Sequence, residues 1–420
     1  MVLVALAGCG DGIGAPDATV PPDSDRGLVR VHLTGEIADK ARVFFQNADS
    51  SLVLATRSDA GGDATGYLAA GGFVTVVYPG DTQRVFTFAG VEPGDVLRVQ
   101  NFAATAKQNI TPVRISVPPA PNAADYSLYS SCGTADIRGA EAAPLDVLLD
   151  ECGQTADMLV VAFSAPAGYL YRADMPVGPG KLAVFDDAYR RFERARVHVE
   201  NVPPSVNTVI VEQSLISDEV ELWGPRVSGG GQVVLPLDGG DGMVEHDMFL
   251  PPTGTLLTRV DPGSSSTMIG VEHVAEWGTP STDVTIDFQA TTLRPYLERA
   301  AYIRAEHALR WTESTAGDVP QAVLATFTWN LGGPGSKNVV WTALAPRGEQ
   351  PVLKLPVLPD PTLTPGSNAT VNLAQQLASI VIDGGYHRIR QLPLMGRFSA
   401  GERWPPDGPT GRVVYQDLAP

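Results

Sequence analysis

The sequence predicts an all-β protein made of tandem antiparallel β-sandwiches that follow a disordered N-terminal tether. From residue 27 onward, short segments alternate apolar and polar side chains with the period of two that half-buried strands require. Glycine (43 residues) and proline (35 residues) exceed their average usage, which favours many turns over long helices. Apolar residues make up 44% of the 420 residues, so the chain can bury a sizeable core.

The first nine residues are typical of the end of an export signal. "MVLVALAG" is apolar throughout, ends in small residues and is too short to span a bilayer. Leu6-Ala7-Gly8-Cys9 resembles the lipobox of bacterial lipoproteins. This resemblance implies that a signal peptide, residues 1–8, is cut just before the cysteine. It also implies that the Cys9 thiol receives a diacylglycerol and that the new amino terminus is acylated.

The segment after the cysteine is rich in Gly, Pro and Asp and almost free of large apolar side chains, so we expect a lipidated, disordered tether over 9–26. No Lys or Arg precedes the apolar run, although a secretory signal normally begins with a basic segment. Either the natural start lies upstream of Met1 and the signal is truncated, or the run is an ordinary strand with a free cysteine. Because Gly10 and not Asp follows Cys9, the lipoprotein resemblance implies an outer-membrane destination.

Three cysteines are an odd number for an exported chain. If Cys9 carries lipid, Cys132 and Cys152 remain as a pair in the related contexts "SSCGTAD" and "DECGQTAD". We expect them to form a disulfide, because two cysteines without a nearby His or third Cys make a poor zinc site. The alternative is two buried free thiols.

The first predicted sandwich domain covers 27–118. "GLVRVHLTG" opens it with clean alternation, and further strands follow at close spacing. The segment "KARVFFQNADSSLVLATRSDAGGDATGYLAAGGFVTVVYP", with its polar turn and Gly-Gly strand entry, resembles transthyretin-like or carboxypeptidase-regulatory-like domains. That resemblance, over about 27–117, implies an immunoglobulin-like or transthyretin-like sandwich with a structural or adhesive role.

Two further β-rich domains are predicted after a linker at 117–125. One is a sandwich over 125–252 that contains the disulfide, and the other is the C-terminal domain over 253–420. The segment 291–314 is ambiguous, since its first half suits a helix and its second half alternates as a strand. We expect a strand from about Tyr302 to Glu313.

Chemistry-bearing patterns are sparse. The formal charge of −17 opposes the binding of phosphate backbones, so we expect no nucleic-acid partner. No nucleophile elbow, Walker loop or H-E-x-x-H pattern occurs. The acidic turn with Asp238 and Asp241 lacks the alternating carboxylates of a calcium loop. The six histidines are scattered along the chain: His32, His198, His246, His273, His307 and His387. We therefore predict no cofactor, no metal site and no catalytic constellation.

Trp311, Trp329 and Trp341 lie in apolar strands, where packing in the core is the expected role. Together these features predict a lipid-anchored cell-envelope protein with a structural or interaction role and no enzymatic activity. The expected partners are the membrane, reached through the lipid, and envelope proteins or glycans. The alternative is a carbohydrate-binding or hydrolytic envelope protein, which would need an exposed aromatic row or two facing carboxylates.

Overall fold

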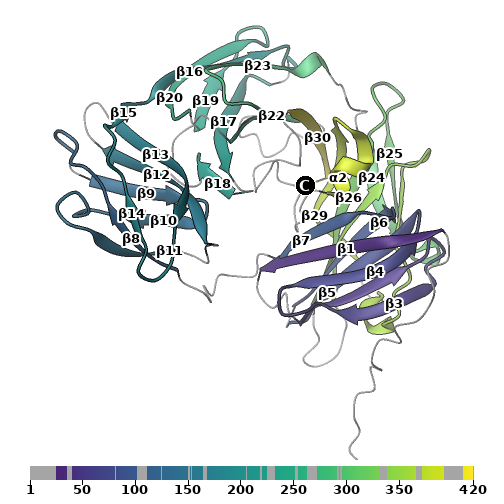
Figure 1. The fold of residues 1–420 in the computed structure, drawn as a ribbon. Coiled ribbons are helices and arrows are strands. Elements are labelled where there is room, and N and C mark those ends of the chain that lie inside the picture. Colours follow the sequence, from purple (N-terminus) through teal and green to yellow (C-terminus); the bar gives the residue numbers. More distant parts are fainter. Residues whose placement is uncertain are drawn as a thin grey trace, which may run out of the picture.

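The computed structural model shows an almost entirely β architecture, which confirms the predicted all-β class (Figure 1). It describes residues 25–35, 40–80, 82–101, 111–123, 125–149, 152, 154–163, 168–204, 206–217, 220–224, 232–250, 254–262, 272–290, 293, 296–330, 338–365, 371–391 and 410–419. By the recurring strand order of the sheets, these residues are divided into four consecutive groups of strands, here called units 1 to 4.

Unit 1 contains β1 (Arg26–Gly35), β2 (Arg42–Gln46), β3 (Leu52–Arg57), β4 (Asp63–Ala69), β5 (Gly72–Tyr78), β6 (Thr82–Val91) and β7 (Val96–Asn101). Unit 2 contains β8 (Thr111–Ser116), β9 (Asp125–Ser130), β10 (Gly133–Asp136), β11 (Leu145–Leu149), β12 (Thr155–Phe163), β13 (Gly168–Pro176), β14 (Leu182–Val184) and β15 (Arg190–Arg191).

Unit 3 contains β16 (Glu193–Glu200), β17 (Thr208–Ser217), β18 (Val220–Trp223), β19 (Gln232–Pro236), β20 (Gly242–Met248), β21 (Thr255–Pro262), β22 (Glu272–Gly278) and β23 (Asp283–Asp287). Unit 4 contains β24 (Tyr296–Ile303), β25 (Ala308–Glu313), β26 (Ala322–Asn330), β27 (Asn338–Pro346), β28 (Val352–Lys354), β29 (Asn372–Ile382) and β30 (Gly411–Ala419).

The first three units share one strand order. In each unit the opening strand (β1, β8 or β16) lies between two partners. It pairs antiparallel with a strand from the middle of the unit (β4, β11 or β20) and parallel with a strand near its end (β7, β14 or β23). The second sheet runs β3-β2-β5-β6 in unit 1, β10-β9-β12-β13 in unit 2 and β18-β17-β21-β22 in unit 3. Because the same order recurs, the fold is an internal repeat.

Unit 4 is a variant of this repeat. Its four-stranded sheet runs β27-β26-β29-β30, and β25 pairs antiparallel with β28 as the opening strand does elsewhere. The other side of β25, where the parallel strand lies in the other units, is occupied by the antiparallel strand β24. The chain segment before β25 therefore completes the small sheet of this unit.

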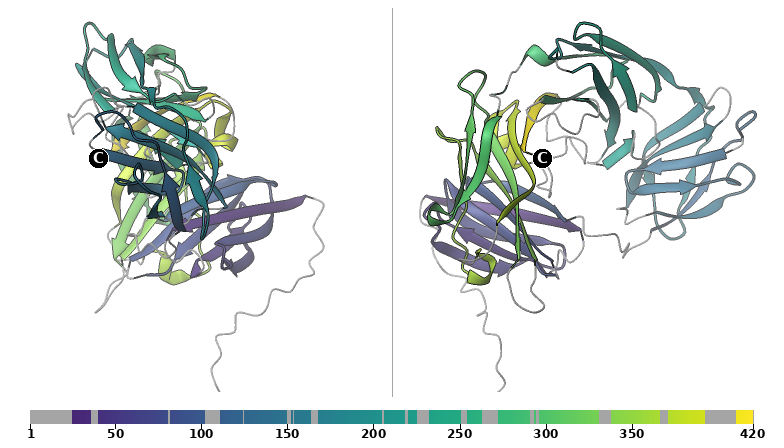
Figure 2. Two further views of the ribbon diagram at one scale, coloured as in Figure 1. Left: turned by 60° about the vertical axis from the view of Figure 1, so that its left-hand side comes forward. Right: turned by 180° about the vertical axis from the view of Figure 1, so that it is seen from behind.

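Three of the four-stranded sheets join edge to edge. β22 of unit 3 pairs with β30 of unit 4, and β27 of unit 4 pairs in parallel with β6 of unit 1. With β19 the result is a single 13-stranded sheet. Figures 1 and 2 show the units following one another in an open arc, in which units 1 and 4 lie side by side.

The strand pairing groups residues differently from the predicted domain ranges. β8 falls inside the predicted range 27–118 but pairs with β11 and β14 of unit 2. Buried residues of unit 1, such as Phe88, share one hydrophobic cluster with Ile380 and Val413 of unit 4. The tandem arrangement of independent domains stays a prediction.

Helices are short in the described ranges. They comprise α2 (Gly385–Arg390) and the 3-10 turns η2 (Phe288–Ala290), η3 (Arg304–Glu306) and η4 (Pro361–Leu363). The continuous strand predicted from Tyr302 to Glu313 is wrong, because η3 and His307, with φ of 51°, turn the chain between β24 and β25. Among the helices that the structure describes, none is long and apolar enough to cross a membrane.

Candidate functional site

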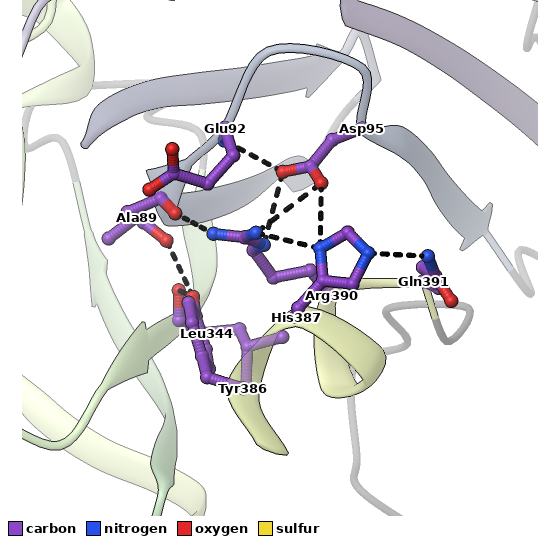
Figure 3. A network of polar contacts seen from close by, with 9 residues as sticks. Ala89, Glu92, Asp95, Leu344, Tyr386, His387, Arg390 and Gln391 are labelled. Carbon is purple, nitrogen blue, oxygen red and sulfur yellow. Dashed lines mark hydrogen bonds and ion pairs between the residues drawn. The ribbon is translucent and has the colours of Figure 1, made fainter. Parts of the chain in front are cut away.

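A buried ionic cluster joins unit 1 to unit 4 (Figure 3). Asp95 lies in the turn between β6 and β7, and Arg390 lies at the end of α2; the two residues are 2% and 3% exposed. The Arg390 Nε lies 3.1 Å from one carboxylate oxygen of Asp95, and its Nη2 donates to the other at 3.3 Å. Arg390 also donates to the carbonyl oxygen of Gly90. We call this group, with Tyr386 and His387, the Asp95 cluster.

The remaining members of the Asp95 cluster also connect α2 to unit 1. Tyr386 donates its hydroxyl to the carbonyl oxygens of Ala89 and Leu344, which belong to β6 and β27. Burial raises the pKa of Tyr386 well above its ordinary value, so the hydroxyl stays a donor. His387 Nδ1 lies 3.3 Å from Asp95. The contacts of Arg390 and His387 with Asp95, of Arg390 with Gly90 and of Tyr386 with Ala89 all join α2 to unit 1, which is the arrangement of a structural joint.

A second polar group, the His273 cluster, lies on the large sheet in unit 3. His273 Nδ1 lies 2.8 Å from Asp261 Oδ1, and Asp261 Oδ2 lies 3.0 Å from Arg259 Nε. Arg259 also forms an ion pair with Glu212. The ring of Tyr415 stacks on His273 with centroids 4.5 Å apart. The side chains of Arg259, Glu212, Asp261 and His273 are 11–22% exposed.

The His273 cluster has the chemistry of an acid–base pair. A carboxylate beside one ring nitrogen orients the ring of a histidine, as it does in acid–base sites. Arg259 also forms an ion pair with Asp261, so Arg259 and His273 share this carboxylate. The described residues therefore supply a base and its orienting group, which are two of the three parts of a nucleophilic site.

A groove of about 700 Å3 runs between units 1 and 4. Its apolar wall includes Phe73, Ala89 and Pro346, and its charged side includes Arg310, Glu349 and Lys354. Both signs of charge occur in it, so the lining selects no class of ligand.

The residues predicted for lipidation and cross-linking fall in different places. Cys9 lies outside the described residues. Cys132 and Cys152 form a disulfide with Cα atoms 5.2 Å apart, which is the pairing expected from the sequence. It connects the end of the β9-β10 hairpin to the segment before β12, and both sulfur-bearing side chains pack against the core of unit 2.

The six histidines are not brought together by the fold. His32 pairs with Asp63 at 2.8 Å, His198 with Asp283 at 3.4 Å, and His307 with the Tyr302 hydroxyl at 3.2 Å. Burial lowers the pKa of His246, and neither of its ring nitrogens has a hydrogen-bond partner in the structure. In the described ranges no group of three or more His, Cys, Asp or Glu residues could hold a metal ion.

The tryptophans considered as sugar platforms belong to the core. Trp311, Trp329 and Trp341 are at most 3% exposed, and the last donates its indole N–H to Thr87 of unit 1 at 2.9 Å. The acidic turn forms a small bridge between Asp238 and Asp241, as a tight turn does.

Sequence reasoning missed both polar clusters. Arg390 and Asp95 are 295 residues apart, and neither lies in a recognisable motif. For the His273 cluster a weak signal existed, because Glu212, Arg259 and His273 all stand at polar positions of alternating strands.

No protein-family model matches the chain, and no curated protein matches it. Among solved structures, the chain is similar to the Bacillus anthracis TIE protein, with 12% identity, a TM-score of 0.14 and coverage of 63% of this chain and 50% of that chain. It is also similar to the native conformation of E. coli alpha-2-macroglobulin, with 11% identity, a TM-score of 0.11 and coverage of 83% and 26%. The chain thus spans half the length of the first and about a quarter of the second. Similarity at this level carries no inference about activity.

Proposed function

We propose that this protein is a lipid-anchored component of a bacterial cell envelope, with a structural or interaction role and no catalytic activity. The anchor is Cys9, by its resemblance to a lipobox, and the expected location is the outer membrane. The β-sandwich units would stand on this anchor and offer their surfaces to envelope proteins or glycans.

The observation that carries this proposal is the joint between units 1 and 4. Three kinds of contact support it: the parallel pairing of β6 with β27, the ion pair of Arg42 with Asp360 at 2.8 Å, and the Asp95 cluster. Buried ion pairs hold a fixed geometry at considerable desolvation cost, and here they serve the connection between units. A firmly joined chain of β-units suits a spacer or scaffold better than an enzyme that must open and close around a substrate.

The anchor is tested by labelling cells with an alkyne fatty acid and comparing the wild type with Cys9→Ala. We expect label on the wild type, none on Cys9→Ala, and loss of the variant from the membrane fraction. The gene should be expressed from its natural start. A wild type that is abundant and unlabelled would refute the anchor.

The second candidate is a hydrolytic envelope protein, and the His273–Asp261 pair favours it. It is tested by incubating the purified Cys9→Ala protein with chromogenic esters and glycosides. Turnover that disappears in Asp261→Asn would replace the first proposal with this one. Turnover that survives this change would come from elsewhere.

A further inference from the structure

One arginine recurs at the same place in all four units. Arg30, Arg114, Arg196 and Arg310 each lie on the opening strand of a small sheet (β1, β8, β16 or β25), between two buried apolar residues. The local sequences are "VRV", "VRI", "ARV" and "LRW". In units 1 to 3 this arginine is also the first residue of the strand to pair with the parallel neighbour. The position therefore points outward from the sandwich in each unit.

In units 2, 3 and 4 a carboxylate accompanies this arginine. Arg114 Nε lies 3.9 Å from Asp146 on the neighbouring strand. Arg196 Nε donates to Glu245 at 2.9 Å. Arg310 pairs with Glu306 at 2.5 Å. The repeat thus neutralises the outward arginine locally, as expected for a protein with an excess of acidic residues.

Unit 1 departs from this pattern. The cross-strand neighbours of Arg30 are Thr65 on β4 and Val96 on β7, and no carboxylate pairs with it among the described residues. Arg26 and Arg98 lie on the same outer face, because they alternate in step with Arg30 along β1 and β7. The face thus gathers three arginines.

The comparison with unit 3 is close, since "RVHL" at 30–33 matches "RVHV" at 196–199. Around Arg196 the two cross-strand neighbours are Glu245 and Asp283. The equivalent neighbours in unit 1 are uncharged. The opening strand is therefore alike in the two units, and the difference in charge comes from the strands beside it.

The same face of unit 1 also presents apolar and amphipathic groups. Tyr67 is 52% exposed and lies opposite the half-buried Leu28, while Val96 is 40% exposed. Arginines beside an exposed tyrosine are the residue types that lie at a membrane–water interface. Among the described outward positions of this face, the one carboxylate is Asp63, which forms an ion pair with His32.

We propose that the outer face of the β4-β1-β7 sheet, here called the basic face, rests on an anionic lipid surface. The proposal rests on the anchor at Cys9 described above and adds the orientation of the protein on its membrane. Residues 10–25 separate the anchor from β1, and a segment of that length spans at most about 60 Å. The basic face is therefore held close to the lipid headgroups. The remainder of the molecule carries the net negative charge and is repelled, so this face turns toward the surface.

An arginine near an anionic bilayer raises the local binding constant about fivefold, so Arg26 and Arg30 together contribute about twenty-five-fold at low salt. That is weak for a protein free in solution but sufficient to orient a tethered one, because the tether supplies a high effective concentration. Screening shortens the range of the attraction to about 8 Å at physiological ionic strength, which requires contact with the surface.

The test uses the full chain coupled through Cys9 to vesicles that carry a maleimide lipid. Cys9 is the free thiol, because the other two cysteines form the disulfide. Tyr67→Trp places a fluorescent reporter on the basic face, and brominated lipid quenches it on contact; the protein without this substitution gives the background. We expect quenching on vesicles with phosphatidylglycerol and little quenching on pure phosphatidylcholine. High salt should abolish the difference.

The decisive comparison adds Arg26→Gln/Arg30→Gln to the reporter protein. Quenching on anionic vesicles should then fall to the level seen on phosphatidylcholine. The matched control, Arg194→Gln/Arg196→Gln in unit 3, removes the same charge and should leave the quenching unchanged. Equal quenching on the two kinds of vesicle, or equal behaviour of the two variants, would overturn the proposal, and an absence of any quenching would point to an acidic protein partner instead. Because the tether is chemical, these results do not depend on whether cells lipidate Cys9.

Discussion

Glu272 provides a sharp test of the packing in unit 3. It lies on β22, is 7% exposed, and accepts a hydrogen bond from the backbone N–H of Leu293. Burial raises its pKa to about 7, with repulsion from Asp318 adding to the shift, while the Leu293 hydrogen bond and the charge of Arg412 oppose it. Glu272→Gln keeps the size of the side chain and the acceptor oxygen but removes the titration.

The sign and size follow from the shift. The pKa rises from 4.5 when unfolded to about 7 when folded, so between these values the folded protein binds the extra proton. The free energy of unfolding therefore falls as pH rises through this window, by up to about 3 kcal/mol in total. Below pH 4.5 both states are protonated and the group adds no pH dependence. Above pH 7 the free energy of unfolding has fallen by nearly the whole of this amount.

The measurement is urea denaturation of the wild type and Glu272→Gln at pH 4, 5, 6, 7 and 8, followed by tryptophan fluorescence. The two proteins should be nearly equally stable at pH 4, and at pH 8 the variant should be more stable than the wild type by up to about 3 kcal/mol. The comparison at pH 4 is the control, since Glu272 is then largely neutral in both the folded and the unfolded state. A difference that stays constant with pH, or a variant that is weaker at pH 8, would refute the reasoning.

Three further changes test other parts of the fold. Arg390→Ala removes one partner of a buried ion pair and should lower the free energy of unfolding by about 3–5 kcal/mol in urea denaturation; a loss under about 1 kcal/mol, typical of exposed pairs, would contradict the role of the Asp95 cluster. Cys132→Ser/Cys152→Ser removes a disulfide that spans 20 residues and should destabilise unit 2 by about 3 kcal/mol. The variant should be cleaved faster by protease, and reductant should produce the same acceleration in the wild type. A variant as resistant to protease as the oxidised wild type would contradict this prediction. Gly66→Ala puts a Cβ 2.6 Å from the ring of Phe45 and should lower the free energy of unfolding by about 1–3 kcal/mol. Thermal unfolding measures this loss, and an unchanged midpoint would contradict it.

The sequence was informative where local chemistry decides the structure. The alternation at 27–35 predicts β1, because one face of that strand is buried and the other is not. Buried positions for Trp311, Trp329 and Trp341 follow from their apolar neighbours in the same way. The disulfide required only the cysteine count and the expected compartment.

What the sequence did not predict depends on distant parts of the chain. The pairing of β6 with β27 joins two strands that look alike from their own residues, and each could have been an edge. Arg390 and Asp95 meet only because α2 packs on the turn before β7. The repeated arginine is visible in the sequence as "VRV", "VRI", "ARV" and "LRW", but short strand segments of this kind are common. Only the shared order of strands in the sheets shows that these four positions are equivalent.

The parallel pairing of β6 with β27 has a consequence for how the chain folds. The indole of Trp341 and the hydroxyl of Thr87 are 254 residues apart, so this part of the sheet cannot close until most of the polypeptide has emerged. Until then β6 presents an open edge, a surface that promotes pairing with other chains. Contacts this remote slow folding, because a long loop must close before they form. Unit 1 should therefore stay open to pairing with other chains for longer than unit 2, whose described strands all pair within 111–191.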